Sequence, residues 1–205
     1  MHAIRDERSY VLNPISDVLS GIDWLVKNGI ADPDRLGVLG FSYGGTLTSY
    51  LVTSTDRFRA AIYGEGAPNV LHYLITYGRK EFLGLGRDLW GFGNPFEPTE
   101  IRRAIEQSAL FRLDRVRTPV LVEAGENSIW ETDRQFYRGL RHFGVPSEFY
   151  VYPRSGHGWD EPVLKKDAYE RHIAWFNYWI KATPYPDAKK QAVYDRWLRA
   201  SGRKK

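Results

Sequence analysis

Ser42 lies in a five-residue pattern, Gly40-Phe41-Ser42-Tyr43-Gly44, that is typical of a serine hydroxyl presented for nucleophilic attack. The apolar run Leu36–Leu39 before it predicts a buried strand, and Thr46–Val52 after it predicts a helix. The flanking glycines permit a sharp strand-to-helix turn, which holds the hydroxyl at the top of a sheet. In such a turn the backbone N–H of Tyr43 and the helix N-terminus point at any oxyanion that forms there. The pattern predicts acyl transfer, and a glycine-rich turn without chemistry is the alternative.

A serine nucleophile needs a base, because its hydroxyl holds the proton tightly at neutral pH. His157 is the best candidate, since it lies between two glycines after a late predicted strand, in the chain order serine, acid, histidine. An ordinary loop histidine is the alternative for this position. His2 is close to the terminus, and the remaining histidines fall in predicted helices, where a packed or surface role is expected. These are His72, His142 and His172.

Composition restricts the classes of protein to consider. A length of 205 residues suits one domain, and an apolar share of 42% is enough for a core. With 0 cysteines there are no disulfides or thiolate metal sites, and no apolar run approaches the length of a membrane span. The start of the chain does not resemble a signal peptide, so a cytoplasmic location is expected. A net charge of +4, partly from the basic C-terminal residues, does not indicate nucleic-acid binding.

No cofactor or metal is expected either. The histidines and carboxylates lack the His-x-x-x-His and Glu-x-x-His spacings of metal sites. The one glycine-rich turn before a helix is the turn at Ser42, and it lacks the lysine that a phosphate-binding loop needs.

The elements that must position these residues alternate between strand and helix. Asn13 is expected to cap a helix over Pro14–Val26. The segment 65–118 is expected to hold helices and loops that either line a pocket or simply connect. The remaining predicted strands are Ala60–Gly64, Pro119–Gly125 and Glu148–Tyr152, and the remaining predicted helices are Thr132–Phe143, Lys166–Ala182 and Asp187–Ala200. This order predicts an α/β fold with a mostly parallel sheet flanked by helices. We expect a catalytic domain over residues 1–182 and a basic, helical extension over 183–205.

Several stretches resemble the C-terminal catalytic domain of the prolyl oligopeptidase family of serine hydrolases. They are Ala31–Gly45, Thr55–Ala61, Arg117–Val122, Gly144–Pro146 and Tyr152–Gly158. The similarity extends from Asp17 to Ile180. It implies an α/β-hydrolase fold, with Ser42 as nucleophile, His157 as general base and the Tyr43 N–H in the oxyanion hole.

The resemblance also implies an acid after the strand that ends at Gly125, but this chain has Ser128 at the position of the family's aspartate. Three neighbouring carboxylates could replace it, with Glu126 taken first and Glu131 and Asp133 as rivals. The latter two equally suit the start of the next helix, because the helix dipole stabilises acidic groups there. A serine could bond the imidazole but could not stabilise its positive charge.

The family domain also has several strands before the helix that starts near Pro14, and these carry the loop that supplies a second oxyanion donor. Only thirteen residues precede Pro14 here. We therefore expect a truncated domain that lacks the first strands of the sheet. An exposed sheet edge of this kind favours association, for example as a homo-oligomer.

Two functions follow. The first is a serine hydrolase that cleaves short peptides, or small esters, through an acyl-enzyme on Ser42. The alternative is an incomplete or inactive hydrolase-like domain that acts in association or dimerisation.

Overall fold

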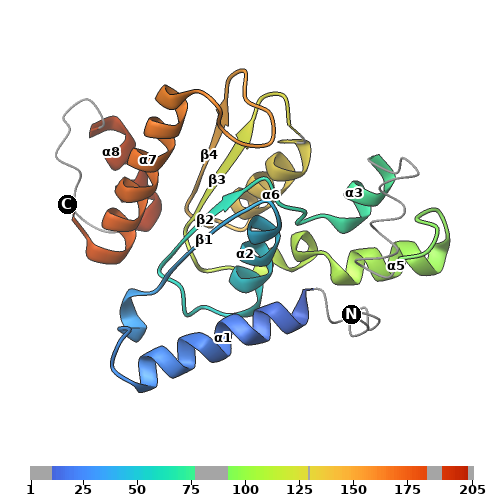
Figure 1. Cartoon of the computed structure of the whole chain (residues 1–205), viewed down its shortest axis with the longest axis horizontal. Helices are drawn as coiled ribbons and strands as arrows, with labels where there is room; N and C mark the ends of the chain where they lie inside the picture. Colours follow the sequence, from blue (N-terminus) through green and yellow to red (C-terminus); the bar gives the residue numbers. More distant parts are fainter. Residues whose placement is uncertain (1–10, 77–91, 129, 184–190, 203–205) are drawn as a thin grey trace.

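The computed structural model describes residues 11–76, 92–128, 130–183 and 191–202. Within them, helices and strands alternate as the sequence predicts (Figure 1). The strands are β1 (Gly37–Phe41), β2 (Ala60–Gly64), β3 (Val120–Gly125) and β4 (Ser147–Tyr152). The α-helices are α1 (Leu12–Lys27), α2 (Tyr43–Ser54), α3 (Val70–Thr76), α5 (Pro98–Gln107), α6 (Trp130–His142), α7 (Pro162–Lys181) and α8 (Gln191–Ser201). Two 3-10 helices, η1 (Pro33–Arg35) and η2 (Ala109–Arg115), complete the described elements.

The described strands form one parallel sheet in the order β1-β2-β3-β4. Leu39 pairs with Ile62 and Ile62 pairs with Leu121, so adjacent strands end close to the same level. Every residue of β2 and β3 is buried, which explains why both strands are nearly continuous apolar runs. The α/β fold with a parallel sheet is confirmed, and the carboxyl ends of the strands meet at one edge, where such sheets place their sites.

Helices cover both faces of the sheet (Figure 1). On one face, Tyr63 and Val122 pack against Phe136 and Leu140 of α6. On the other face, where α7 and α8 lie, the alternate strand residues pack against an aromatic cluster. This cluster contains Trp175, Tyr178, Trp179, Tyr194 and Trp197. The period of two along each strand therefore divides the core into two apolar clusters.

The basic C-terminal extension contributes to the second cluster. In α8, Tyr194 and Trp197 are buried against α7, and Val193 lies partly buried beside them. Arg196 of α8 also bonds Glu148 of β4. Helix α8 thus packs on the same core as the rest of the described chain.

The segment 65–118 contains α3, α5 and η2 and, in its described part, no strand. Val70 and Leu74 of α3 pack against Ala104 of α5, in a small cluster separate from the two faces of the sheet. Residues 77–91 of this segment lie outside the described residues.

The predicted cap at Asn13 is wrong. Helix α1 begins earlier, at Leu12, and its N-cap residue Val11 makes no side-chain cap bond. Pro14 is therefore in the first turn, where its missing N–H leaves no helical bond unmade. The error has no consequence for the apolar face, since Ile15 is buried and Leu19 packs beside it.

Strand β1 differs from its neighbours because it forms an edge of the described sheet. Leu39 is 52% exposed and Phe41 is 37% exposed, whereas β2 is buried throughout. Separately, none of the helices in the described ranges is long and apolar enough to cross a membrane.

Candidate active site

Ser42 is the residue at which β1 turns into α2. Its backbone has φ 58° and ψ −120°, a left-handed conformation that is uncommon outside glycine. Such strain is typical of functional turns that are held in place by their surroundings. A Cβ on Gly40 would lie 2.0 Å from the carbonyl oxygen of Gly44, so only glycine permits this close turn. The local geometry is that of a nucleophile elbow.

The end of β2 holds this turn from the side. The backbone N–H of Ser42 donates to the carbonyl oxygen of Gly64 at 2.9 Å. A Cβ on Gly45 would lie 2.3 Å from the same oxygen, so glycine lets α2 start directly against β2. The Tyr43 N–H belongs to the first turn of α2, at the N-terminus of the helix.

His157 lies in the loop between β4 and α7, and the end of β3 fixes the base of this loop. The Asn127 N–H donates to the Ser155 carbonyl oxygen at 2.8 Å. A Cβ on Gly125 would lie only 2.1 Å from the carbonyl oxygen of Gly156, so the close approach requires glycine there. These contacts hold the backbone of the loop against the carboxyl end of β3.

The structure brings His157 and Ser42 into contact, with His157 Nε2 2.8 Å from Ser42 Oγ. The imidazole is 51% exposed, so a substrate can approach it. The Ser42 hydroxyl donates to Nε2 when the ring proton is on Nδ1. This is the arrangement that lets a histidine remove the hydroxyl proton during attack.

The other ring nitrogen of His157 contacts a carboxylate that we did not predict. Glu65 follows β2 directly, and its Oε2 is 2.5 Å from His157 Nδ1. Its Oε1 accepts a bond from the Gly125 N–H, also at 2.5 Å. The Glu65 side chain is 0% exposed. Glu65 could have been noticed because it is an acidic residue at the carboxyl end of a buried strand, next to the strand that precedes the serine.

The carboxylates that the sequence suggested as acids have other surroundings. The exposed Glu126 carboxylate accepts a bond from the Arg154 N–H at 2.8 Å. Glu131 is exposed in the first turn of α6. Ser128 lies in the turn after β3, where its N–H donates to the Gly125 carbonyl oxygen. Among the described residues, the carboxylate in contact with His157 is that of Glu65.

Asp133 is buried between α6 and the sheet, where the Tyr63 hydroxyl donates to its Oδ1 at 2.7 Å. Burial raises the pKa of the Asp133 carboxyl well above its usual range. The hydrogen bond from Tyr63 lowers this pKa in part, and the nearby Glu65 raises it. The site therefore favours the protonated, neutral form of Asp133.

Aromatic rings lie near the imidazole of His157. The centroid of the Phe41 ring is 5.0 Å from that of the imidazole, and Trp159 meets Phe41 edge-on at 5.2 Å. Trp159 also stacks on Tyr152 at 4.9 Å. These contacts connect the histidine loop to the end of β4.

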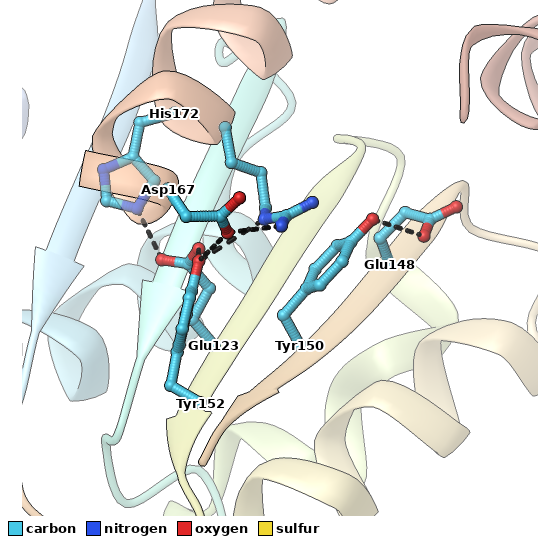
Figure 2. Close-up of polar contacts among 7 residues, drawn as sticks. Glu123, Glu148, Tyr150, Tyr152, Asp167 and His172 are labelled. Atoms are coloured by element: carbon cyan, nitrogen blue, oxygen red, sulfur yellow. Dashed lines mark hydrogen bonds and ion pairs between the residues drawn. The ribbon is translucent and has the colours of Figure 1, made fainter. Parts of the chain in front are cut away.

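Tyr152 leads to a second glutamate–histidine pair, drawn in Figure 2. Glu123 of β3 is 1% exposed, and its carboxylate contacts Nε2 of His172 from α7. The Tyr152 hydroxyl donates to Glu123 Oε1 at 3.0 Å. Asp167 and Arg171 of α7 form an ion pair at 2.5 Å beside this hydroxyl. The contact between Glu123 and His172 fastens α7 to the sheet, as expected for a packed helical histidine.

Of the other histidines, His72 lies in α3, where Gln135 contacts its Nδ1 at 2.9 Å. His142 is at the end of α6, next to the ring of Phe143. His2 lies outside the described residues.

Comparison with curated proteins finds peptidases. The lasso peptide isopeptidase AtxE2 of Asticcacaulis excentricus is 25% identical over 192 residues, which are 91% of this chain and 26% of that protein. The acylamino-acid-releasing enzyme of Arabidopsis thaliana is 27% identical, over 82% of this chain and 23% of its own length. A dipeptidyl peptidase family member of Caenorhabditis elegans is 30% identical, over 76% of this chain and 21% of its own length. This chain therefore spans about a quarter of each of these relatives, or less.

Solved structures show the same fold. A variant of AtxE2 isopeptidase with Astexin3-dC4 bound has a TM-score of 0.79 and 21% identity, and the match covers 98% of this chain and 31% of the other. The acylaminoacyl peptidase of Pyrococcus horikoshii has a TM-score of 0.76 and 23% identity, with 92% and 31% covered. The family model of the prolyl oligopeptidase family matches residues 4–183. The chain belongs to the prolyl oligopeptidase family.

Proposed function

We propose that this chain is a serine hydrolase that cleaves peptide bonds in short peptides through an acyl-enzyme on Ser42. The observation that carries the proposal is the 2.8 Å contact between Ser42 Oγ and His157 Nε2 at the carboxyl edge of the parallel sheet. Membership of a family of peptidases supports peptide bonds as the substrate class. The relatives' names describe an isopeptidase, an acylamino-acid-releasing enzyme and a dipeptidyl peptidase.

In the proposed first step, Ser42 Oγ attacks the carbonyl carbon while its proton passes to His157 Nε2. The tetrahedral intermediate carries a negative charge on the former carbonyl oxygen, and the Tyr43 N–H and the N-terminus of α2 stabilise it. The C–N bond then breaks as Nε2 returns the proton to the departing amine. Water repeats these steps on the acyl-enzyme and releases the acid.

Esters are the sister substrates. The exposed imidazole and half-buried serine leave the site open, and an alcohol departs more easily than an amine. A small activated ester is therefore the first substrate to assay, followed by short peptides.

The test is a fluorophosphonate probe, which phosphorylates activated serines. We expect covalent labelling that peptide mapping assigns to Ser42 and that the Ser42→Ala variant abolishes. Absence of labelling in protein shown to be folded by circular dichroism would contradict the proposal.

Association is a second candidate role, and the edge of β1, which no other described strand pairs, supports it. Leu39 and Phe41 are exposed there, and an unpaired strand edge can accept another strand. We propose that a second copy of the chain pairs with this edge. Light scattering should then give a dimer, and Leu39→Lys should shift it to monomer. A monomeric wild-type chain that labels at Ser42 would contradict this role while leaving the hydrolase intact.

A further inference from the structure

We propose that Glu65, at the end of β2, is the acid that positions His157, so that this role has moved away from the loop after β3. The inference rests on the proposed function, since it names the third member of the same site. It departs from the family pattern implied by sequence, which places the acid at Ser128. Glu65 acts through His157 and is therefore a positioning residue.

The first support is contact geometry on both sides of the imidazole. Oε2 of Glu65 lies 2.5 Å from Nδ1, while Nε2 faces Ser42 Oγ at 2.8 Å. A carboxylate at Nδ1 keeps the proton on that nitrogen and leaves Nε2 free to accept the serine proton. His157 Nε2 is therefore hydrogen-bonded to Ser42, and Nδ1 is within ion-pair distance of Glu65 Oε2, which has no hydrogen-bond partner among the described residues.

The second support is the burial of the carboxylate. The Glu65 side chain is 0% exposed, so water screens its charge poorly. The positive charge that develops on His157 during attack then interacts with a close, unscreened anion. Oε1 accepts a bond from the Gly125 N–H, which holds the carboxylate in place and satisfies its second oxygen.

The third support is the backbone that presents Glu65. Its φ is 45°, in the left-handed region, so the chain turns sharply as soon as β2 ends. The Glu65 N–H donates to the Glu123 carbonyl oxygen at 3.3 Å, across to β3. The preceding carbonyl, of Gly64, is the one that accepts the bond from Ser42. The same few residues therefore hold both the serine and the carboxylate.

The fourth support is that the loop after β3 has another use. Glu126 bonds the Arg154 N–H, and Asn127 bonds the Ser155 carbonyl oxygen. Both contacts are to the backbone of the loop that bears His157, and neither is to the imidazole. Asp133 accepts a bond from the Tyr63 hydroxyl, and burial raises its pKa well above the usual range. Glu126 and Asn127 therefore support the loop and Asp133 supports the core, which leaves Glu65 to supply the negative charge next to His157.

The test compares substitutions that each remove one carboxylate charge. Glu65→Gln should slow fluorophosphonate labelling of Ser42 on the order of 10⁴-fold, as loss of the acid does in other triads. Glu65→Asp, which keeps the charge and tolerates the left-handed backbone, should recover much of this loss. The matched variants Glu126→Gln and Glu131→Gln should label within a few-fold of wild type. Wild-type labelling in Glu65→Gln, or a large loss in Glu126→Gln alone, would overturn the proposal.

A second readout does not need activity. The Nδ1 proton shared between His157 and Glu65 should give a low-field resonance in the proton NMR spectrum. Glu65→Gln and His157→Gln should both remove it, and Glu126→Gln should not. If wild type fails to label but Glu65 still controls this resonance, the proposed function fails while the placement of Glu65 stands. A resonance that Glu65→Gln leaves unchanged contradicts the placement itself.

Discussion

The described part of the chain contains two buried glutamates that each contact a histidine, and in one of these pairs the histidine also contacts Ser42. Glu65 contacts His157 through Nδ1, and Nε2 faces Ser42 on the exposed side. Glu123 contacts His172 through Nε2, and its other oxygen takes the Tyr152 hydroxyl (Figure 2).

The two pairs differ in which imidazole nitrogen the carboxylate contacts and in how much of the imidazole is exposed. His157 is 51% exposed in a loop at the carboxyl edge of the sheet, whereas His172 of α7 is 16% exposed. A histidine can act as a base for a serine only when its free nitrogen faces the hydroxyl. The Glu123 pair fastens a helix to the sheet, so a glutamate–histidine contact alone does not identify a site.

The largest expected effect separates the two histidines. His157→Gln should lower turnover of an activated ester by about 10⁶-fold, because the base is lost. His172→Gln should change turnover no more than a few-fold, since this ring does not contact the serine or its base. Steady-state kinetics on both purified variants provides the measurement, and equal losses in the two would remove the distinction.

The Glu123–His172 pair should matter for stability rather than for turnover. Glu123→Ala leaves His172 and the Tyr152 hydroxyl without their buried partner. We expect its free energy of unfolding to fall by about 3 kcal/mol, because two largely buried polar groups lose their hydrogen-bond partner. Urea denaturation followed by Trp fluorescence measures this, with Glu126→Gln as the surface control. A loss below that of the control would show that Glu123 does not anchor α7.

Tyr152 sharpens the boundary between the pairs, because its hydroxyl bonds Glu123 while its ring stacks on Trp159 beside the histidine loop. Tyr152→Phe removes only the hydroxyl. We expect about 1–2 kcal/mol less stability and nearly unchanged labelling of Ser42. A large loss of labelling without loss of stability would mean that the two pairs are coupled.

The effect expected at Asp133 depends on pH. Its pKa is raised by burial, so the folded state keeps a proton that the unfolded chain has already lost above its ordinary value of 3.8. The unfolded state then binds fewer protons, and the folded state loses stability as pH rises from that value toward the raised one. The Asp133→Asn variant does not lose stability in this way, because asparagine does not titrate.

The stability of wild type relative to Asp133→Asn should therefore fall with pH, by at most about 1.4 kcal/mol per pH unit. Urea denaturation of both proteins between about pH 4 and 7 measures the difference. A difference independent of pH would show that Asp133 is ionised in the folded state.

Sequence alone predicts the fold well because its signals are local. Continuous apolar runs mark β2 and β3, and the glycines around Ser42 mark the turn. The start of α1 was harder to place, because Asn13 and Pro14 form a familiar helix-start pattern yet α1 already begins at Leu12.

The contact between Glu65 and His157 was not predictable in the same way. Ser42 and His157 are in motifs that position them locally, and their catalytic roles stay predictions. Glu65 reaches the histidine only because its backbone adopts φ 45° and because β2 lies between β1 and β3. Both depend on contacts between residues far apart in the sequence. The family pattern directed attention to the loop after β3, where Glu126 is nearest in sequence to Ser128 but bonds Arg154.

The most direct test of the central claim is the rate constant for fluorophosphonate labelling of Ser42 in Glu65→Gln relative to Glu123→Gln. Both variants replace a buried glutamate of a glutamate–histidine pair by its isosteric amide. We expect labelling on the order of 10⁴-fold slower in Glu65→Gln and within a few-fold of wild type in folded Glu123→Gln. Equal rates in the two variants, or faster labelling in Glu65→Gln, would contradict a catalytic site built from Ser42, His157 and Glu65.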